Sequence, residues 1–187
     1  MLPPTIPLFP LPNVVLFPNV LLPLHIFEPR YRDLVRDALA GDQVIGMVLL
    51  RPGYEADYDG RPPIYSVGCA GLITHSHERS DGRYDIVLRG LEKFRVGTEA
   101  STHAYRLADV EVLPETLDDA ATIQLRRERQ RLEAILAVTT EQLLGRPTFP
   151  PSLGDEDLVN ALAQYLDFPA VERSEEHTSE LQSRLHL

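Results

Sequence analysis

Lysine and cysteine are almost absent from this chain of 187 residues. Lys93 is the only lysine, and arginine supplies the other 17 positive charges, so a lysine-dependent catalyst would have to use Lys93. Cys69 is the only cysteine and cannot form a disulfide within the chain, which indicates a reducing compartment. The net charge of −10 argues against nonspecific binding to nucleic acid or to anionic lipid.

Long apolar runs are absent as well. The longest one after the N-terminal segment, residues 44–50, is far shorter than the roughly 20 residues of a transmembrane helix. The N-terminal segment has no positively charged start, and prolines interrupt its apolar runs, so we expect no signal peptide. These absences predict a cytoplasmic protein without membrane contact. The 43% of apolar residues that are present suffice for a packed core.

Prolines crowd the start of the chain, where eight of the 16 lie in the first 29 residues. Because proline has no N–H group and a fixed φ, this segment is predicted to form short extended pieces joined by turns. Its best strand candidates are residues 14–17 and 20–26, which are rich in apolar and β-branched side chains.

A helical pattern follows this segment. Apolar residues recur at helical spacing from Tyr31 to Leu39, on one face of the predicted helix. Pro29 suits its first turn and Gly41 its C-terminal end, so we expect a helix of about three turns.

Alternating apolar residues and turn signals predict a β-rich part up to residue 113. Ser-Asp-Gly at residues 80–82 is the strongest hairpin signal. Gly90 interrupts the second arm of this hairpin, as a bulge or a barrel corner would. The expected strands are residues 44–50, 65–79, 83–96 and 105–113, with a proline- and glycine-rich loop at residues 51–63.

Helical patterns dominate the remainder. One covers residues 117–144, and a shorter amphipathic one follows the possible capping box at residues 152–155. The predicted fold class is therefore α+β, with a compact β-barrel-like domain at residues 1–113 that contains one inserted helix. A small α-helical extension at residues 114–172 follows this domain.

The last residues, 173–187, continue none of these patterns. Their sequence, RSEEHTSELQSRLHL, resembles the translation of a common sequencing adapter. We therefore expect a non-native tail that is unnecessary for folding, and a helical extension that is truncated near residue 172. His177 and His186 are excluded from any candidate site for this reason.

His75 and His77 are the sharpest candidates for metal ligands, because residues two apart on a strand share a face. Cys69 and His103 are conceivable partners, but no motif spacing joins them, and zinc takes roughly three or four protein ligands. We therefore expect no metal site, exposed histidines on a hairpin arm and a buried, unreactive thiol at Cys69.

Six stretches of the chain, in order and at fitting separations, resemble the N-terminal domain of Lon proteases. The resemblance covers residues 5–170 and is closest to small proteins that consist of this domain only. It implies a PUA-like pseudo-barrel with a helical extension, and a non-catalytic module that recognises polypeptide substrates. The stretches are PLFPLPNVVLFP, LPLHIFEPRYRDLV, VIGMVLLRPG, VGCAGLI, DGRYDIVLRGLEKFRV and AYRLADVEVL.

This family likeness implies partners as well as a fold. We expect unfolded or degron-bearing polypeptides as ligands, no cofactor, and a separate protease or chaperone as a further partner in proteolysis or protein quality control. Asn19 departs mildly from the family pattern, which often has glycine after Phe-Pro at this turn.

Two groups of residues are candidates for the functional site. The first, on or next to the 51–63 loop, supplies aromatic and cationic contact area for a substrate and consists of Arg51, Tyr54, Tyr58 and Tyr65. The second belongs to the family-like motifs and is expected to be mainly structural, with direct ligand contact by His25 and Glu28 as the alternative. It consists of His25, Glu28, Pro29, Arg30, Tyr31 and Gly90.

Two other function classes have less support. A peptidase would need catalytic motifs, and the sequence contains neither a phosphate-binding Gly-x-x-x-x-Gly-Lys-Ser/Thr loop nor a Gly-x-Ser-x-Gly elbow. No motif places a serine beside Lys93, so we expect no catalytic residues. RNA binding is suggested by the PUA-like fold but opposed by the net charge of −10 and the single lysine.

Overall fold

The computed structural model describes residues 2–58, 60–100, 102–113, 123–124, 126–131, 154–165 and 169–175, and its fold is α+β. The elements are, in chain order, β1 (Thr5–Leu11), β2 (Leu21–Ile26), α1 (Pro29–Ala40), β3 (Val44–Leu50), the 3-10 turn η1 (Tyr54–Asp57), β4 (Ile64–Glu78), β5 (Tyr84–Ala100), β6 (Arg106–Val112), α3 (Asp155–Tyr165) and α4 (Ala170–Glu175).

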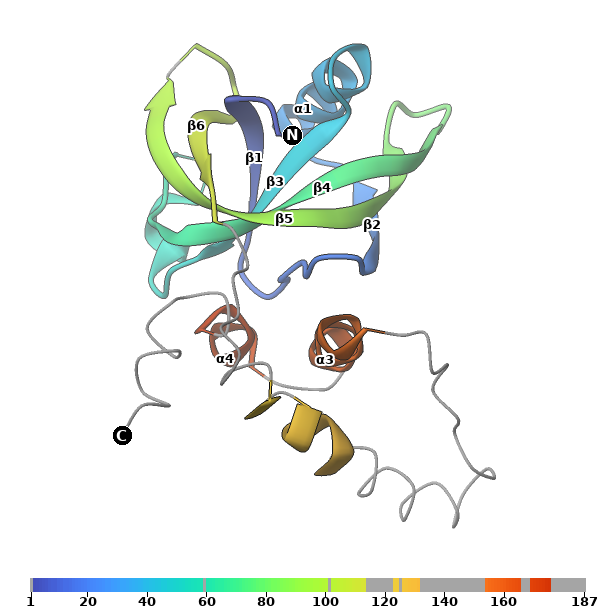
Figure 1. Ribbon diagram of the computed structural model, residues 1–187. Coiled ribbons are helices and arrows are strands. Elements are labelled where there is room, and N and C mark those ends of the chain that lie inside the picture. Colours follow the sequence, from blue (N-terminus) through green and yellow to red (C-terminus); the bar gives the residue numbers. More distant parts are fainter. Residues whose placement is uncertain are drawn as a thin grey trace.

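The described strands form one sheet that closes on itself. Their order is β2-β5-β4-β3-β1-β6, and β6 also pairs with β5. Only β1 and β3 are parallel; the other described pairs are antiparallel. Because β5 pairs with β2 in its first half and with β6 in its second, it closes the predicted pseudo-barrel. Figure 1 shows α1 at one end of this pseudo-barrel and α3 and α4 at the other.

The strand β1 was not predicted, because Pro7 and Pro10 lie within it. It pairs in register with β6 over Thr5–Leu8 and with β3 over Leu8–Leu11. Each proline therefore lies where only one edge of β1 has a partner among the described strands. The missing N–H group of each proline need not interrupt a hydrogen-bond ladder at such a position.

The prediction of a strand at residues 14–17 was wrong. The backbone there is irregular, although Val15, Leu16 and Phe17 are buried. Leu16 packs into the core beneath α1, whereas Val15 and Phe17 belong to a cluster that includes Ala163 of α3. The apolar pattern thus reflects burial on two sides of an irregular segment, not strand pairing. The second strand candidate, residues 20–26, is confirmed as β2.

The helix α1 confirms the prediction from helical spacing. Pro29 occupies its first turn, and the N–H of Gly41 donates to the carbonyl of Ala38 at its end. The buried face of α1 packs into the core cluster that also contains Phe9 and Ile45. That face consists of Tyr31, Leu34, Val35 and Ala38.

The hairpin of β4 and β5 and the buried strand β3 are also confirmed. A second cluster of buried side chains fills the pseudo-barrel on the side where β5 meets β6. Phe94 is at its centre and is fully buried, in contact with residues of β1 and β3.

Gly90 marks a close approach between β5 and the turn at residues 17–20. A Cβ atom at Gly90 would overlap the carbonyl oxygen of Phe17. The N–H of Asn19 donates to the carbonyl of Gly90 at 3.0 Å, and the N–H of Gly90 donates to the carbonyl of Val20 at 2.9 Å. Asn19 has a φ of 61°, a left-handed conformation that glycine and asparagine adopt most readily. The register between β4 and β5 shifts beside Gly90, which agrees with the bulge that was one of the two predictions for this position.

The helical extension is described only in part. The predicted helix at residues 117–144 lies mostly outside the described residues, although residues 126–131 are helical. The short amphipathic helix is confirmed as α3. The last described helix, α4, runs to Glu175, beyond the boundary predicted at residue 172, and residues 176–187 lie outside the described part. The proposed division at residue 113 and the non-native tail stay predictions.

Candidate functional site

The four loop residues predicted to bind substrate form two separate pairs. The Arg51 guanidinium lies over the Tyr65 ring, 5.3 Å from its centroid, and its Nε donates to the carbonyl of Ile64 at 3.0 Å. Tyr65 packs against the apolar cluster that contains Ala163 of α3. The rings of Tyr54 and Tyr58, which lie between Arg51 and Tyr65 in the sequence, are 6.1 Å apart. The loop therefore presents two surfaces and not one.

Tyr58 joins the residues at the start of α1, which were expected to be mainly structural. Its hydroxyl donates to Oε1 of Glu28 at 2.7 Å, and its carbonyl accepts from Nη1 of Arg30 at 3.0 Å. Arg30 also forms an ion pair with Oε2 of Glu28 at 3.0 Å. Its guanidinium lies between two rings, 4.7 Å from the centroid of Tyr31 and 5.0 Å from that of Tyr58.

These contacts use the geometry of the helix entrance. Glu28 is the N-cap residue, and its carbonyl accepts from the N–H groups of Tyr31 and Arg32, while its side chain makes no capping bond. The side chain of Glu28 is therefore directed to Arg30 and Tyr58 instead. Pro29 fixes the first turn of the helix between them.

The tyrosines of this group stay protonated over an extended pH range. Burial raises the pKa of the Tyr31 hydroxyl strongly, although the positive charge of Arg30 opposes the shift. Burial and the hydrogen bond to Glu28 raise the pKa of Tyr58. Both rings therefore face Arg30 as neutral aromatic surfaces, which suits a cation–π contact.

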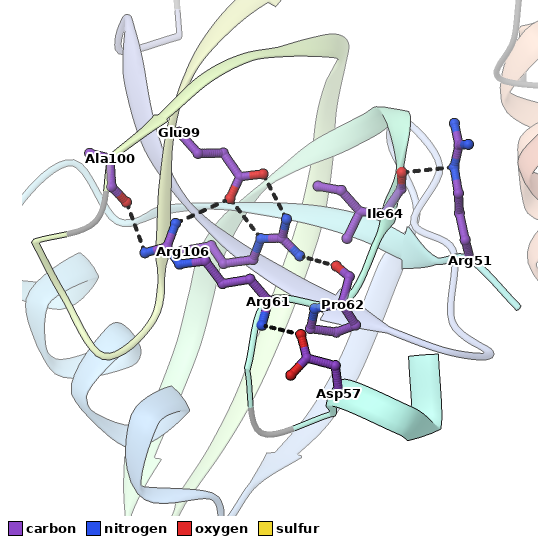
Figure 2. Close-up of polar contacts among 8 residues, drawn as sticks. All are labelled: Arg51, Asp57, Arg61, Pro62, Ile64, Glu99, Ala100 and Arg106. Carbon is purple, nitrogen blue, oxygen red and sulfur yellow. Dashed lines mark hydrogen bonds and ion pairs between the residues drawn. The ribbon is translucent and has the colours of Figure 1, made fainter. Parts of the chain in front are cut away.

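A second group of charged residues lies where β5 and β6 meet the 51–63 loop (Figure 2). The guanidinium of Arg106 binds both carboxylate oxygens of Glu99, at 2.8 Å from Nε and 2.7 Å from Nη2. Its Nη1 donates to the carbonyl of Pro62 at 2.6 Å, and Arg61 donates to the carbonyl of Ala100 at 3.1 Å. The hydrogen bonds from Arg106 hold the pKa of Glu99 below its usual value.

This second group was not predicted from the sequence. Glu99 and Arg106 lie on two strands whose pairing has an irregular register after Val96, so no simple spacing links them. The pairing of β5 with β6 is the information that was lacking. Arg61 lies in the predicted loop, but its role depends on the same strands.

The two groups enclose a cavity of about 200 Å³. Three arginines contribute to its lining, together with aromatic and apolar side chains and the exposed His103. The lining includes Arg30, Arg61, Arg106, Tyr31, Tyr58 and Leu50. The cavity therefore combines positive charge with aromatic surface, an arrangement that can bind an anionic group attached to an apolar one.

A second hollow of about 230 Å³ adjoins the cavity, since His103 and Tyr105 line both. The hydroxyl of Tyr105 donates to Oδ2 of Asp37 at 2.7 Å. Burial and this hydrogen bond raise the pKa of Tyr105 strongly. The walls of the second hollow are mainly apolar, although Asp37 and Asp42 also line it. Its apolar lining includes Pro3, Ile6, Pro7, Val44 and Leu107.

His25 lies outside both hollows, on the edge strand β2. Its Nδ1 is 2.7 Å from Oδ1 of Asp85, its cross-strand partner, and Arg79 donates to the other oxygen of Asp85 at 2.7 Å. The hydrogen bond from Arg79, followed by that with His25, lowers the pKa of Asp85. His25 was expected to be mainly structural, and the structure pairs it with the side chain of Asp85.

The remaining candidates are not part of this site. Cys69 is buried, as predicted, and His75 and His77 are exposed on β4. Lys93 is half-buried on β5. Among the described residues, no cluster of three or more histidine, cysteine or acidic side chains could hold a metal ion. Within the same part of the chain, no helix has the length and apolar character needed to cross a membrane.

The sequence match identifies the family that carries this fold. Residues 5–175 match the family model of the ATP-dependent protease La (LON) substrate-binding domain. The chain belongs to this family. The resemblance inferred from the six sequence stretches is therefore confirmed, as is the fold that it implied.

Full-length relatives in the Lon family are much longer than this chain. The chain is 30% identical over 196 residues to the Lon protease of Anaeromyxobacter dehalogenans, covering 100% of this chain and 22% of that protein. It is 30% identical over 149 residues to the Lon protease of Dictyoglomus thermophilum, covering 76% of this chain and 18% of that protein. The chain thus spans about a fifth of the length of these curated relatives.

Two solved Lon structures resemble the pseudo-barrel and its extension. The Lon N-terminal domain protein from Xanthomonas campestris superposes with a TM-score of 0.61 at 27% identity, over 91% of this chain and 88% of that one. The N-terminal domain of the Mycobacterium avium complex Lon protease gives a TM-score of 0.65 at 20% identity, over 97% and 94%. The second likeness shows a shared fold.

Proposed function

We propose that this chain binds polypeptides that are unfolded or carry a degradation signal, and that it catalyses no reaction itself. The observation that carries the proposal is the match of residues 5–175 to a family described as a substrate-binding domain. The chain would act in the cytoplasm and supply substrates to a separate protease or chaperone. The proposal takes only substrate binding from the Lon proteases, since the chain spans about a fifth of their length.

Two surfaces of the described structure support polypeptide binding. Tyr58 brings the predicted loop into the cavity beside Arg30, so it is the loop residue with the strongest structural support. Leu21 and Phe27 are exposed large apolar side chains on and just after the edge strand β2. An extended polypeptide binds most readily where aromatic anchors lie beside an exposed strand edge.

The test measures binding of an unfolded polypeptide directly. The full chain is titrated into a fluorescently labelled protein, either permanently unfolded by reduction and alkylation or folded, and anisotropy is followed at two salt concentrations. We expect binding to the unfolded form only, with little dependence on salt, because apolar contacts dominate. Binding to neither form, or equally to both, would overturn the proposal.

A matched pair of variants assigns the binding to the site. Tyr58→Ala removes a ring from the cavity, whereas Arg83→Ala changes an exposed residue at the distant hairpin turn. We expect weaker binding for Tyr58→Ala alone. The alternative is a peptidase. It would be favoured if an activity that hydrolyses unfolded casein, with or without ATP, stayed with the chain through further purification steps.

A further inference from the structure

The charged side chains in the described lining of the cavity between the start of α1 and the β5–β6 end are all arginines, namely Arg30, Arg61 and Arg106. Two carboxylates, those of Glu28 and Glu99, bind these guanidinium groups. Neither carboxylate is itself part of the described lining. The carboxylate of Asp57 binds the backbone N–H of Arg61 and is not part of the lining.

Both carboxylates are fully engaged, whereas the arginines are not. Glu28 uses one oxygen for Arg30 and the other for the Tyr58 hydroxyl. Glu99 uses both oxygens for Arg106. The contacts of the described residues use only part of the N–H donors that each guanidinium carries. An incoming anion would therefore find donors and would meet no uncommitted carboxylate of the described lining.

The charge belongs to the cavity and not to the protein as a whole. The chain carries a net charge of −10, so its overall field repels anions. Arg106 is held with its side chain only 11% exposed, and Arg30 with 17% exposed. Guanidinium groups fixed in this way are pre-organised for a carboxylate, because little side-chain entropy remains to be lost.

The other walls fit an uncharged, apolar group of the same ligand. Tyr31, Tyr58 and Leu50 line the cavity together with the arginines, and burial keeps both tyrosines neutral. A simple inorganic anion would leave this surface unfilled. A ligand that carries a carboxylate and an apolar side chain on the same residue would contact both kinds of wall.

We propose that the cavity receives the C-terminal residue of a bound polypeptide, with its carboxylate on the arginines and its side chain against the tyrosines. The preceding residues would cross His103 and Tyr105 into the apolar hollow. Asp37 and Asp42 in the lining of that hollow favour a neutral or cationic residue upstream. This inference rests on the proposed function and names the substrate feature that the site recognises.

An internal acidic residue fits the cavity less well. Its carboxylate would reach the arginines, but its chain would have to enter and leave a space of about 200 Å³. Its side chain also offers no apolar group to the tyrosines and Leu50. A chain end needs only one way in, which the adjoining hollow provides.

The test compares three peptides that share one sequence and carry a fluorophore at the N-terminus. The first ends in leucine with a free carboxylate, the second is its C-terminal amide, and the third is an amide with aspartate beside the leucine. We expect the full chain to bind the free acid about tenfold or more tightly than either amide, because only the free acid places a terminal charge in the cavity. Equal affinities for the free acid and its amide overturn the inference, as does an aspartate peptide that binds as tightly as the free acid.

Substitution locates the effect. Arg61 is the most exposed of the three arginines, with 38% of its side chain accessible, so Arg61→Gln should fold; we expect it to lower the ratio of acid to amide affinity several-fold. Arg83→Gln, at the distant hairpin turn, should leave the ratio unchanged. An unchanged ratio in Arg61→Gln would count against the cavity, and the three peptides on the unaltered chain decide the question even if this variant fails to fold.

The unfolded-protein titration separates the two proposals. If the unfolded protein binds but the peptides show no preference for a free carboxylate, only the present inference fails. If the chain binds no unfolded polypeptide at all, the proposed function fails together with it.

Discussion

The pseudo-barrel is packed differently from its contact with the helical extension. The pseudo-barrel is filled by large side chains such as Phe94, Leu8 and Leu88, all fully buried and contributed by different parts of the sheet. Of the side chains that the structure describes in α3 and α4, the small Ala163 and Ala170 belong to the apolar cluster that faces the pseudo-barrel. Free energy from apolar burial scales with area at about 25 cal/mol per Å², so it is concentrated in the pseudo-barrel.

At the helices, polar contacts add to the limited apolar burial. Nδ2 of Asn19 donates to Oδ1 of Asp157 in α3 at 2.8 Å, and Nδ2 of Asn160 reaches the carbonyl of Pro18 at 3.5 Å. Both contacts involve the turn at residues 17–20, which Gly90 holds on β5. This turn therefore couples a strongly packed part of the molecule to a more weakly packed one.

The largest expected effect tests the packing of the pseudo-barrel. Phe94→Ala should lower the free energy of unfolding by about 4 kcal/mol, because it removes a ring that is 0% exposed and leaves a cavity. Phe27→Ala is the matched control, since its ring is 59% exposed, and should change the free energy by less than about 0.5 kcal/mol. Urea unfolding followed by circular dichroism measures both. Similar losses in the two variants would contradict the described core.

The next effect concerns the turn between the two regions. Gly90→Ala should lower the free energy of unfolding by about 3 kcal/mol, because its Cβ would overlap the Phe17 carbonyl and displace backbone. In Gly97→Ala, on the same strand, the added Cβ would lie 3.1 Å from the carbonyl oxygen of Asp109. This variant should therefore lower the free energy of unfolding much less. The same unfolding measurement compares the two. If Gly97→Ala proved the more damaging of the two, the turn would not be packed on β5 as described.

Local patterns in the sequence predicted the parts of the fold that depend on neighbouring residues. The helix at Pro29–Ala40 and the strand at Val44–Leu50 followed from spacing, because one face or both faces of each element are buried. Thr5–Leu11 was missed because its prolines are tolerable only when the strand changes partners halfway. That change is a property of the closed sheet and has no local signal.

The candidate site shows the same limit. Tyr58 was predicted as a binding residue and Arg30 as a structural one, yet the structure joins them in one cavity although they are 28 positions apart. Glu99 and Arg106 were not predicted, because their contact depends on the register of two strands. The family motifs contain Arg30 and Arg106, but only the packing shows that the two side chains line one cavity.

A smaller effect tests the polar contact between the two regions. Asn19→Ala should lower the free energy of unfolding by about 2 kcal/mol, since alanine disfavours the φ of 61° and cannot bond to Asp157. Asn19→Gly keeps the backbone conformation and loses only the hydrogen bond to Asp157. It should therefore lower the free energy of unfolding by about 0.5 to 1 kcal/mol. A double-mutant cycle with Asp157→Ala measures the bond itself. A coupling energy of zero in that cycle would mean that the contact does not join the regions.

The smallest effect is the pH dependence of the Glu99 pair, and it should be confined to the pseudo-barrel. The hydrogen bonds from Arg106 lower the folded-state pKa of Glu99 below the ordinary value of 4.5. A carboxylate with a lowered pKa contributes stability that is fully present above its unfolded-state pKa and is lost as the pH falls through its folded-state pKa. Glu99→Gln should therefore be less stable than the unaltered chain by about 1 kcal/mol near neutral pH, and this difference should shrink below about pH 4.5. Urea unfolding of both proteins from about pH 7 to about pH 3 checks the sign. A difference that stayed constant over this range would contradict the lowered pKa of Glu99 and would show that its contact with Arg106 does not depend on its charge.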